Sequence, residues 1–341
     1  MKHLLLFAVL CTLGPQAAQA KDSPQKEDMQ QEKTLEKPDP AEDDAAKEAA
    51  VPSSKAISSK PYKDNFIGEM KEHVAAYEDT LVQLARDNDL GYVEMRAANP
   101  NLDPWIPGKG TTVLLPTMQI LPDAPRKGIV INLPEMRLYY YDKETDTPVS
   151  FPLGVGREGL STPLGTTHIR AKKEKPTWRP TARMREEDPK LPAVVNPGPD
   201  NPLGTHILYL GWPEYGIHGT NKPFGIGRRS SSGCIRMYPE DILKLWPEVP
   251  VNTLVTVVDQ PVKAAWIENE FFIEAHTSIG QANTIEENGG TPNYEMSEGD
   301  MEQILKAAGK DVHLLDWPKI RNIIRTRSGY PIVVAKRPEQ S

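Results

Sequence analysis

Three features are scarce in this sequence: cysteine, excess positive charge and long hydrophobic runs. Only two cysteines occur in 341 residues, Cys11 and Cys234, so the fold does not rest on a disulfide framework. The formal net charge of −7 argues against a protein that binds nucleic acid, because such binding rests on clustered positive charge. After residue 20, no apolar run reaches the ~20 residues that a membrane-spanning helix requires.

The first 20 residues have the pattern of a cleavable export signal. Lys2 gives a positive start, residues 4–13 are mostly apolar, and Ala18-Gln19-Ala20 fits a small-x-small cleavage site. We therefore expect a periplasmic protein from which Cys11 has been removed, leaving Cys234 as the lone thiol.

Composition and pattern divide the rest of the chain into four parts. Residues 21–60 contain no aromatic residue and are rich in charged residues, alanine, serine and proline, which predicts a disordered linker. Residues 66–117 predict a small module with the order strand, helix, helix, strand. Residues 127–259 predict a mainly β domain, and residues 261–341 a small appended α+β subdomain whose function is not readable.

Local patterns predict the elements within these parts. In the first module we expect strands over 71–77 and 112–116 and helices that start near Thr80 and over 92–98. In the central domain the strand candidates are 128–133, 137–141, 149–155, 165–171, 206–210 and 254–258, with one helix over 239–245. Mostly strand with one helix indicates a small sandwich or barrel.

Longer connections and the C-terminal region are predicted from the same patterns. The proline-rich stretch 172–202 predicts a loop, with Trp178 and Arg179 as candidate substrate contacts. In the C-terminal region the predictions are a strand-like segment over 264–276, a loop over 280–297, helices over 300–310 and 317–327, and a strand over 330–335.

The residues with catalytic chemistry gather around Cys234, which follows His218 by sixteen positions. A thiolate is the nucleophilic form of cysteine, and a nearby imidazole or cation makes it available at neutral pH. His218 is the candidate base, and the backbone carbonyl of Gly219 is placed to orient its ring in the absence of a triad carboxylate.

The segment around the cysteine suggests the remaining catalytic parts. Gly233 permits a turn that brings backbone N–H groups of Gly233 and Cys234 beside the sulfur, where they are candidates for an oxyanion hole. In an extended segment Arg236 points to the same face as Cys234, where it can lower the thiol pKa or bind a substrate carboxylate.

Three segments together resemble the catalytic domain of the L,D-transpeptidase family, also called YkuD: Ile217-His218-Gly219-Thr220-Asn221, Phe224-Gly225-Ile226-Gly227, and Ser231-Ser232-Gly233-Cys234-Ile235-Arg236-Met237. The resemblance covers about residues 127–259 and implies a mainly β sandwich that uses no metal and no cofactor. It also implies substrate contacts from Thr220, Ser231, Ser232, Gly233 and Arg236. Ser232 departs from the family, because many members carry a second histidine there.

The resemblance implies a reaction on peptidoglycan. Cys234 attacks the carbonyl of the third residue of a tetrapeptide stem, an L-centre joined to D-alanine, and His218 takes the thiol proton and gives it to the departing D-alanine. An amine of a second stem peptide or of a wall-anchored protein then resolves the thioester. Members of the family are commonly acylated by carbapenems at the cysteine.

The first module has its own resemblance. Asp79-Thr80-Leu81, Leu84-Ala85 and Ala98-Asn99-Pro100 are similar to a LysM module, which implies binding to glycan strands that contain N-acetylglucosamine.

Other interpretations stay open or are disfavoured. Resolution of the thioester by water would make the protein an L,D-carboxypeptidase or endopeptidase, and a non-enzymatic wall-binding protein would leave the cysteine cluster unexplained. A peptidase of the papain or NlpC/P60 type is disfavoured, because those enzymes place the cysteine before the histidine. A zinc site is also disfavoured, because the closely spaced ligand pairs of such sites do not occur among His206, His218, Cys234 and His276.

Overall fold

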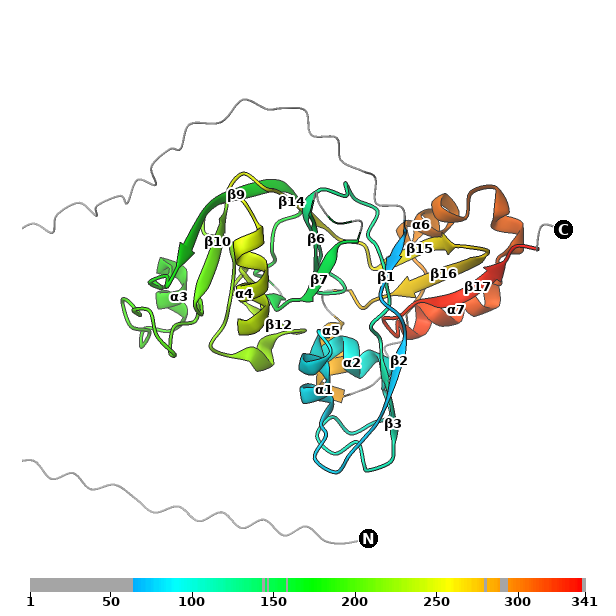
Figure 1. Ribbon diagram of the computed structural model, residues 1–341, viewed down its shortest axis with the longest axis horizontal. Helices are drawn as coiled ribbons and strands as arrows, with labels where there is room; N and C mark the ends of the chain where they lie inside the picture. The colour runs from blue at the N-terminus through cyan, green and yellow to red at the C-terminus, as the bar shows by residue number, and fades with distance from the viewer. Residues whose placement is uncertain are drawn as a thin grey trace, which may run out of the picture. The chain divides into compact units, whose positions relative to one another are not determined.

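The computed structural model describes residues 64–338 except 143, 144, 146, 158, 279, 280 and 289–293. The predicted export signal (1–20) and linker (21–60) lie outside the described residues. The described elements form an N-terminal module, a central sheet and a C-terminal subdomain (Figure 1).

The N-terminal module (residues 71–115) is built on one antiparallel strand pair. Strands β2 (Lys71–Val74) and β3 (Thr112–Leu115) pair, and helices α1 (Leu81–Asp87) and α2 (Tyr92–Ala98) lie between them in the chain. The side chain of Thr80 caps α1 by accepting the Gln83 N–H at 3.0 Å. The predicted order of strand, helix, helix and strand is thereby confirmed. Strands β1 (Phe66–Ile67) and β4 (Gln119–Ile120) pair outside this module.

The central domain is mainly β, as predicted, and contains one curled sheet of eight strands in the order β13-β11-β10-β9-β14-β5-β6-β7 (Figure 1). Neighbouring strands are antiparallel except the parallel pairs β11–β13 and β5–β14. In chain order the strands are β5 Gly128–Asn132, β6 Arg137–Tyr141, β7 Val149–Pro152, β9 Gly165–Glu174, β10 His206–Leu210, β11 Gly216–His218, β13 Ile235–Arg236 and β14 Leu254–Val258.

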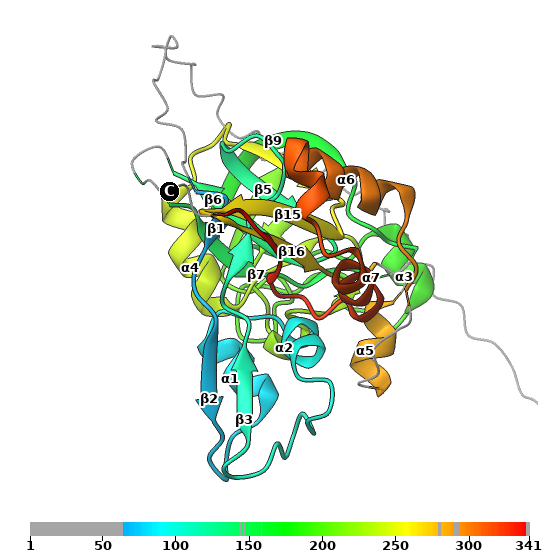
Figure 2. The same cartoon turned by 90° about the vertical axis from the view of Figure 1, so that its right-hand side faces the viewer.

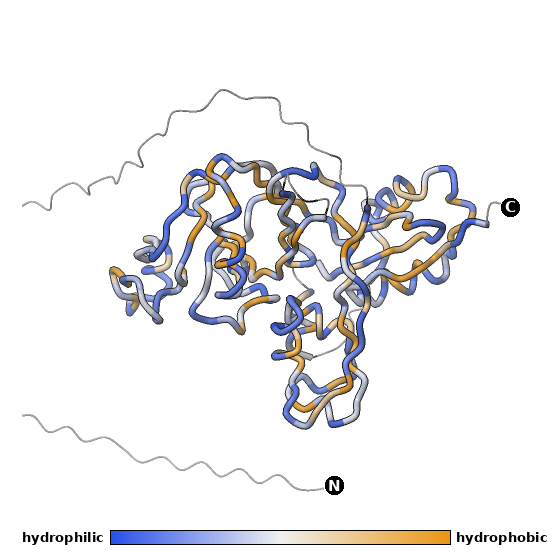
Figure 3. The backbone as a smooth tube through the Cα atoms, viewed as in Figure 1, coloured by the Kyte–Doolittle hydropathy of each residue, from blue (hydrophilic) through white to orange (hydrophobic). Residues whose placement is uncertain are grey.

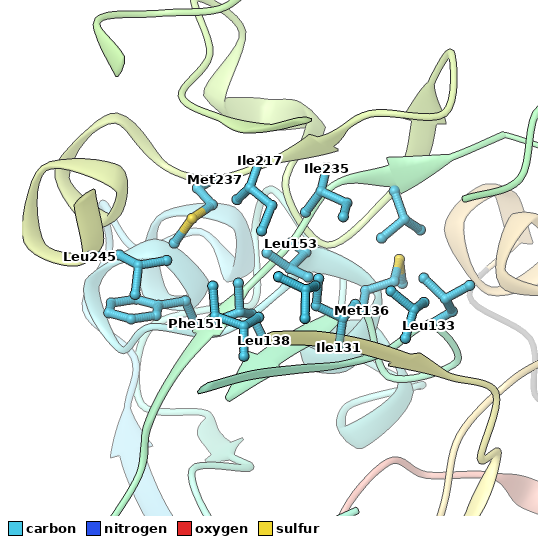
Figure 4. Close-up of a cluster of buried hydrophobic side chains, with 14 of the residues drawn as sticks. Ile131, Leu133, Met136, Leu138, Phe151, Leu153, Ile217, Ile235, Met237 and Leu245 are labelled. Carbon is cyan, nitrogen blue, oxygen red and sulfur yellow. The ribbon is translucent and has the colours of Figure 1, made fainter. Parts of the chain in front are cut away.

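The main hydrophobic core lies against this sheet and fixes which way the short strands β11 and β13 face. Figure 4 shows Ile217 of β11 and Ile235 of β13 directed toward Leu153 and the rest of the cluster. Helix α4 (Pro239–Glu248) packs against β10 with Ile242 and Leu245 buried, and it continues past the predicted end at Leu245. Because these residues are fully buried, the orientation of β11 and β13 is set by the core.

The connection between β11 and β13 is held by a small second strand pair. Strand β12 (Arg229–Ser231) pairs in parallel with β8 (Val155–Gly156), after a single 3₁₀ turn, η1 (Pro223–Gly225). Helix α3 (Ala182–Glu187) interrupts the stretch 172–202, which the sequence predicts as a loop.

The C-terminal subdomain combines a three-stranded antiparallel sheet with helices, as predicted (Figure 2). Its elements are β15 Val262–Ile267, β16 Glu270–Ala275, α5 Ala282–Asn288, α6 Glu298–Ala308, η2 Gly309–Leu314, α7 Trp317–Thr326 and β17 Ile332–Lys336. The predicted strand-like segment 264–276 is confirmed, and it forms a hairpin with Glu268 at positive φ (+53°) in its turn. The predicted loop over 280–297 is wrong, because this region contains helix α5, whose Ala282 and Ile285 are buried in the main core.

Hydrophobic and hydrophilic segments alternate along the backbone (Figure 3). Strand β9 shows the pattern clearly, since its burial alternates around His168 and Arg170 while Ile169 is fully buried. Among the described residues, no helix combines the length and the apolar character that crossing a membrane requires.

Candidate active site

Strand pairing places His218, Cys234 and Arg236 on one face. In the parallel ladder Ile217 pairs with Ile235 and His218 with Arg236. Side chains alternate along a strand, and both isoleucines point into the core, so His218 and Arg236 point to the opposite face. Cys234 immediately precedes Ile235 and shares that face. The short parallel ladder thus brings His218 and Cys234, which are sixteen positions apart in the sequence, to the same face.

The imidazole of His218 is buried and oriented by backbone. Its Nδ1 lies 2.6 Å from the carbonyl oxygen of Gly219, so Nδ1 carries the ring proton and donates it to that carbonyl. Burial lowers the pKa of His218 to about 4, while the Gly219 carbonyl raises it and the charge of Arg236 lowers it further. The ring is therefore neutral at pH 7, with Nε2 free to accept a proton.

The thiol of Cys234 lies beside the backbone of β11 and the turn before it. Its Sγ donates to the carbonyl oxygen of Glu214 at 3.4 Å. Burial raises the pKa of the thiol, while the Gly216 N–H and the charge of Arg236 lower it. The direction differs from the sequence-based expectation of a readily formed thiolate, because burial is the largest effect. Cys234 and His218 are thus both neutral at rest.

Arg236 is a partly buried cation that faces the site. Its backbone N–H and carbonyl pair with those of Gly154 at 2.8 and 2.9 Å. Among the described residues, its guanidinium has no hydrogen bond or ion pair, and burial lowers its pKa, which the thiol of Cys234 partly offsets. A buried cation without a carboxylate partner is a suitable receptor for an anionic group of a substrate.

The turn before Cys234 is stabilised by three hydrogen bonds. The Ser231 hydroxyl donates to the carbonyl of Cys234 at 2.5 Å and accepts the Gly233 N–H at 3.2 Å, and the Thr162 hydroxyl donates to the Gly233 carbonyl at 2.8 Å. Gly233 has φ +112°, a conformation that other residues rarely adopt. The Gly233 N–H, a predicted oxyanion donor, is thus already bound to Ser231.

The two other predicted contact residues occupy different surroundings. Ser232 is half-buried within the same turn, between Ser231 and Gly233. Thr220 is buried, and its hydroxyl accepts the Lys222 N–H at 3.0 Å, which shapes the start of the loop after His218. The structure therefore groups Ser232 with the cysteine turn and gives Thr220 a hydrogen bond within its own loop.

Two backbone groups at the site are not signalled by residue type. The carbonyl of Glu214 accepts a hydrogen bond from the thiol, and the Gly216 N–H is directed at the sulfur. Glu214 has φ +67°, which is uncommon for a residue with a Cβ, and a Cβ at Gly216 would lie 2.9 Å from the Ile207 side chain. Gly216 in the strand segment before His218 is the one sequence signal that could have identified this contact.

One buried cluster outside the site has the residue types of a metal centre. Single ligand atoms of Glu135, Glu274 and His276 lie within 4.8 Å of one another. The ammonium of Lys263 contacts both carboxylates, reaching Glu274 at 2.8 Å, and Nε2 of His276 lies 2.5 Å from Glu274. The lysine already supplies the positive charge that a metal ion would bring to the two carboxylates.

A partly buried thiol and a neutral imidazole lie on one face, next to a cation that has no ion pair among the described residues, and this face is the candidate active site. Residues 126–257 match the YkuD family, described as the L,D-transpeptidase catalytic domain. The chain is 46% identical over 205 residues to the Escherichia coli (strain K12) protein named Probable L,D-transpeptidase YbiS, which covers 58% of this chain and 67% of that protein.

Two further relatives match over longer segments. Probable L,D-transpeptidase ErfK/SrfK of Salmonella typhimurium is 39% identical over 255 residues, which cover 73% of this chain and 80% of that protein. Probable L,D-transpeptidase YcfS of Escherichia coli is 34% identical over 288 residues, which cover 81% of this chain and 87% of that protein. The chain belongs to the L,D-transpeptidase family.

Proposed function

We propose that the chain transfers peptidoglycan stem peptides through a thioester on Cys234, with His218 as the catalytic base. The observation that carries this proposal is the common face of His218, Cys234 and Arg236, with Nδ1 of His218 bound to the Gly219 carbonyl at 2.6 Å. Membership of the family supports the substrate class.

In the first half-reaction Sγ of Cys234 attacks the carbonyl carbon of the third stem residue, an L-centre joined to D-alanine. Nε2 of His218 accepts the thiol proton as the carbon–sulfur bond forms. The carbon–nitrogen bond then breaks, and His218 gives the proton to the nitrogen of the departing D-alanine. In the second half-reaction an amine attacks the thioester carbon and His218 takes the amine proton. The carbon–sulfur bond then breaks, and His218 returns the proton to the sulfur, which restores the free thiol.

The two pKa shifts oppose a thiolate–imidazolium pair at rest, so the thiol proton moves to His218 as Sγ attacks the substrate. With the pKa of His218 at about 4 and that of Cys234 raised, both groups are neutral at pH 7, so no ion pair forms before substrate binds. The Glu214 carbonyl holds the thiol at rest, and the Gly216 N–H and Arg236 stabilise negative charge on the sulfur as the proton leaves.

The backbone N–H of Cys234 is the oxyanion donor in this proposal, while that of Gly216 is directed at the sulfur. The Gly233 N–H donates to the Ser231 hydroxyl and is therefore not assigned to the oxyanion. Gly233 instead permits the conformation of the turn, and Ser231 and Ser232 lie in the same turn. Arg236 binds the carboxylate of the stem peptide, since its guanidinium has no other anionic partner among the described residues.

The N-terminal module binds the glycan strand of the wall in the same proposal. Tyr77, which is 82% exposed, lies on the loop before α1, and Trp105, which is 59% exposed, lies on the loop after α2. These loops are adjacent, because the Leu81 N–H donates to the Pro104 carbonyl at 2.9 Å. Neighbouring Ile106 is also exposed, and exposed apolar and aromatic groups gathered on one surface indicate a binding site. Export to the periplasm, predicted from residues 1–20, gives the protein access to the wall.

Purified tetrapeptide muropeptides test the proposal. Wild-type protein is incubated with them and the products are analysed by mass spectrometry, with Cys234→Ala as the control. A dimer that lacks one D-alanine identifies transpeptidation, and a free tripeptide identifies carboxypeptidase action. If wild type and Cys234→Ala give the same unchanged substrate, the proposal is wrong.

A further inference from the structure

Helix α2 of the N-terminal module is buried on both of its sides. Residues 92–97 are all buried. Met95 belongs to the module's own core, whereas Tyr92, Val93 and Ala97 belong to the main core of the central sheet. Helix α5 packs on α2 as well, and its Ala282 and Ile285 belong to that same core (Figures 1 and 2). The module is therefore part of the folded body of the enzyme.

The backbone of this helix touches the loop that joins the two catalytic residues. We call residues 219–233 the catalytic loop. The Val93 N–H donates to the Gly227 carbonyl at 3.1 Å. Gly227 has φ +71°, a Cβ there would overlap the backbone nitrogen of Tyr92, and a Cβ at Gly91 would lie 2.9 Å from the Cα of Gly227. Two glycines thus allow a contact between main chains that no side chain separates.

The opposite side of the catalytic loop is fixed to the central domain. The Gly227 N–H donates to the Leu153 carbonyl at 2.9 Å, and the Val155 N–H donates to the Arg228 carbonyl at 3.1 Å. The Arg157 N–H donates to the Ser231 carbonyl at 2.9 Å, three residues before Cys234. The catalytic loop is therefore held between β8 on one side and α2 on the other.

Charged side chains add further contacts between the N-terminal module and the rest of the fold. The guanidinium of Arg228 lies 3.7 Å from the centre of the Tyr92 ring and pairs with Glu286 of α5. Glu94 of α2 forms a buried ion pair with Arg137 of β6 at 2.9 Å. Arg86 of α1 donates twice to Glu240, at 2.7 and 2.9 Å, and Glu240 lies in the first turn of α4, which follows β13.

We infer that helix α2 is a positioning element for the nucleophile, with Tyr92, Gly227 and Arg228 as positioning residues for the transfer reaction. The inference deepens the proposed function and rests on it for the reaction concerned. Displacement of a reacting group by about 1 Å can reduce a rate about 100-fold. The contact at Gly227 sets the path of the catalytic loop and, through it, the place of the sulfur relative to the imidazole.

The test uses the full chain and the variants Tyr92→Ala and Arg228→Gln, with soluble tetrapeptide muropeptide as substrate. We expect kcat to fall about 10- to 100-fold, with KM and binding to sacculi little changed. Tyr92→Phe keeps a ring face for Arg228 and should restore kcat. Val113→Ala weakens the module's own core away from the contact between α2 and the catalytic loop. It serves as a control whose Tm is compared with those of Tyr92→Ala and Arg228→Gln.

Alkylation of Cys234 by iodoacetamide gives a readout that is independent of the transfer reaction. If the contacts of α2 with the catalytic loop hold the sulfur in its partly buried position, Tyr92→Ala and Arg228→Gln shift the pH profile of alkylation to lower pH while kcat falls. An unchanged alkylation profile in both variants, or a fall in kcat for Val113→Ala as large as theirs at the same Tm, would overturn the inference. Absence of acyl transfer in wild type would overturn the proposed function and leave the alkylation comparison to decide the positioning role.

Discussion

His218 and Arg236 are direct partners in the parallel ladder between β11 and β13, so an imidazole and a guanidinium stand side by side on the face that carries Cys234. The cation lowers the pKa of both His218 and Cys234. A positive neighbour thus makes the base harder to protonate and the thiol easier to ionise. The effect on the thiol favours loss of its proton, whereas the effect on His218 keeps the imidazole neutral and opposes its protonation before the attack.

The first prediction concerns the base. His218→Gln removes the proton acceptor at Nε2, and we expect the rate of acylation by a carbapenem to fall about 100- to 10,000-fold. Intact-protein mass spectrometry of the adduct on Cys234, followed over time, measures the rate. Thermal unfolding of the variant is the control for folding, and an unchanged acylation rate would exclude His218 as the base.

The second prediction concerns Arg236. Arg236→Gln removes a cation that lowers both pKa values, so the pKa of Cys234 and that of His218 should each rise. The alkaline limb of Cys234 alkylation then moves to higher pH, and NMR titration of the His218 ring gives a pKa above about 4. A shift of either group to lower pH contradicts the arrangement. The loss of a carboxylate receptor should also raise KM for the stem peptide.

The third prediction is a dependence of stability on pH. The pKa of His218 is about 4 in the folded protein and 6.5 in its ordinary state, so the unfolded chain binds more protons between these values. The free energy of unfolding therefore falls as the pH drops from 6.5 to 4, and this histidine accounts for up to about 3 kcal/mol of the loss. Denaturant unfolding of wild type and His218→Gln across this range isolates the effect, since the other groups titrate in both. Parallel stability curves would contradict it.

The fourth prediction concerns the buried pair between α2 and β6. Glu94→Leu leaves the guanidinium of Arg137 buried without its partner, and we expect a loss of about 3–5 kcal/mol in the free energy of unfolding. The double variant Glu94→Leu/Arg137→Leu removes both charges and should recover most of that loss. Urea denaturation of the wild type, both single variants and the double variant measures the coupling. Additive losses would show that the two charges do not stabilise each other.

The fifth prediction concerns the turn before the nucleophile. Gly233→Ala places a Cβ at 3.0 Å from the ring of Tyr215 in a backbone with φ +112°. We expect a loss of about 1–3 kcal/mol in stability together with slower acylation of Cys234. Gly159→Ala is the matched control, because Gly159 also has positive φ (+77°) but an added Cβ meets nothing within 4 Å. Equal acylation rates for the two variants would show that the conformation of the turn at Gly233 does not affect the reaction of Cys234.

The sequence predicts those elements whose formation is decided locally. Helix α2 has the predicted bounds, Tyr92–Ala98, because Asn99-Pro100 ends it, and strands β5 and β6 fall where apolar residues surround a turn. Helix α5 was missed because its segment is polar. It is stabilised by burial of Ala282 and Ile285 against elements far away in the sequence.

The site divides in the same way. Residue type and spacing identify Cys234, His218 and Arg236 as candidates, and side-chain alternation in an extended segment relates Cys234 to Arg236. The contacts of Glu214 and Gly216 use backbone groups that every residue has, so residue type does not reveal them. The raised pKa of the thiol follows from burial, which depends on how the whole domain packs.

Helix α2 contacts three parts of the fold at once: the core of the N-terminal module, the core of the central sheet and helix α5. A substitution on it must therefore suit several surfaces at once. Exchange of this module for that of a relative is expected to succeed only when α2 is transferred with the segment around Gly227 and Arg228. The unit that can be recombined is thus larger than the module whose boundaries the sequence suggests.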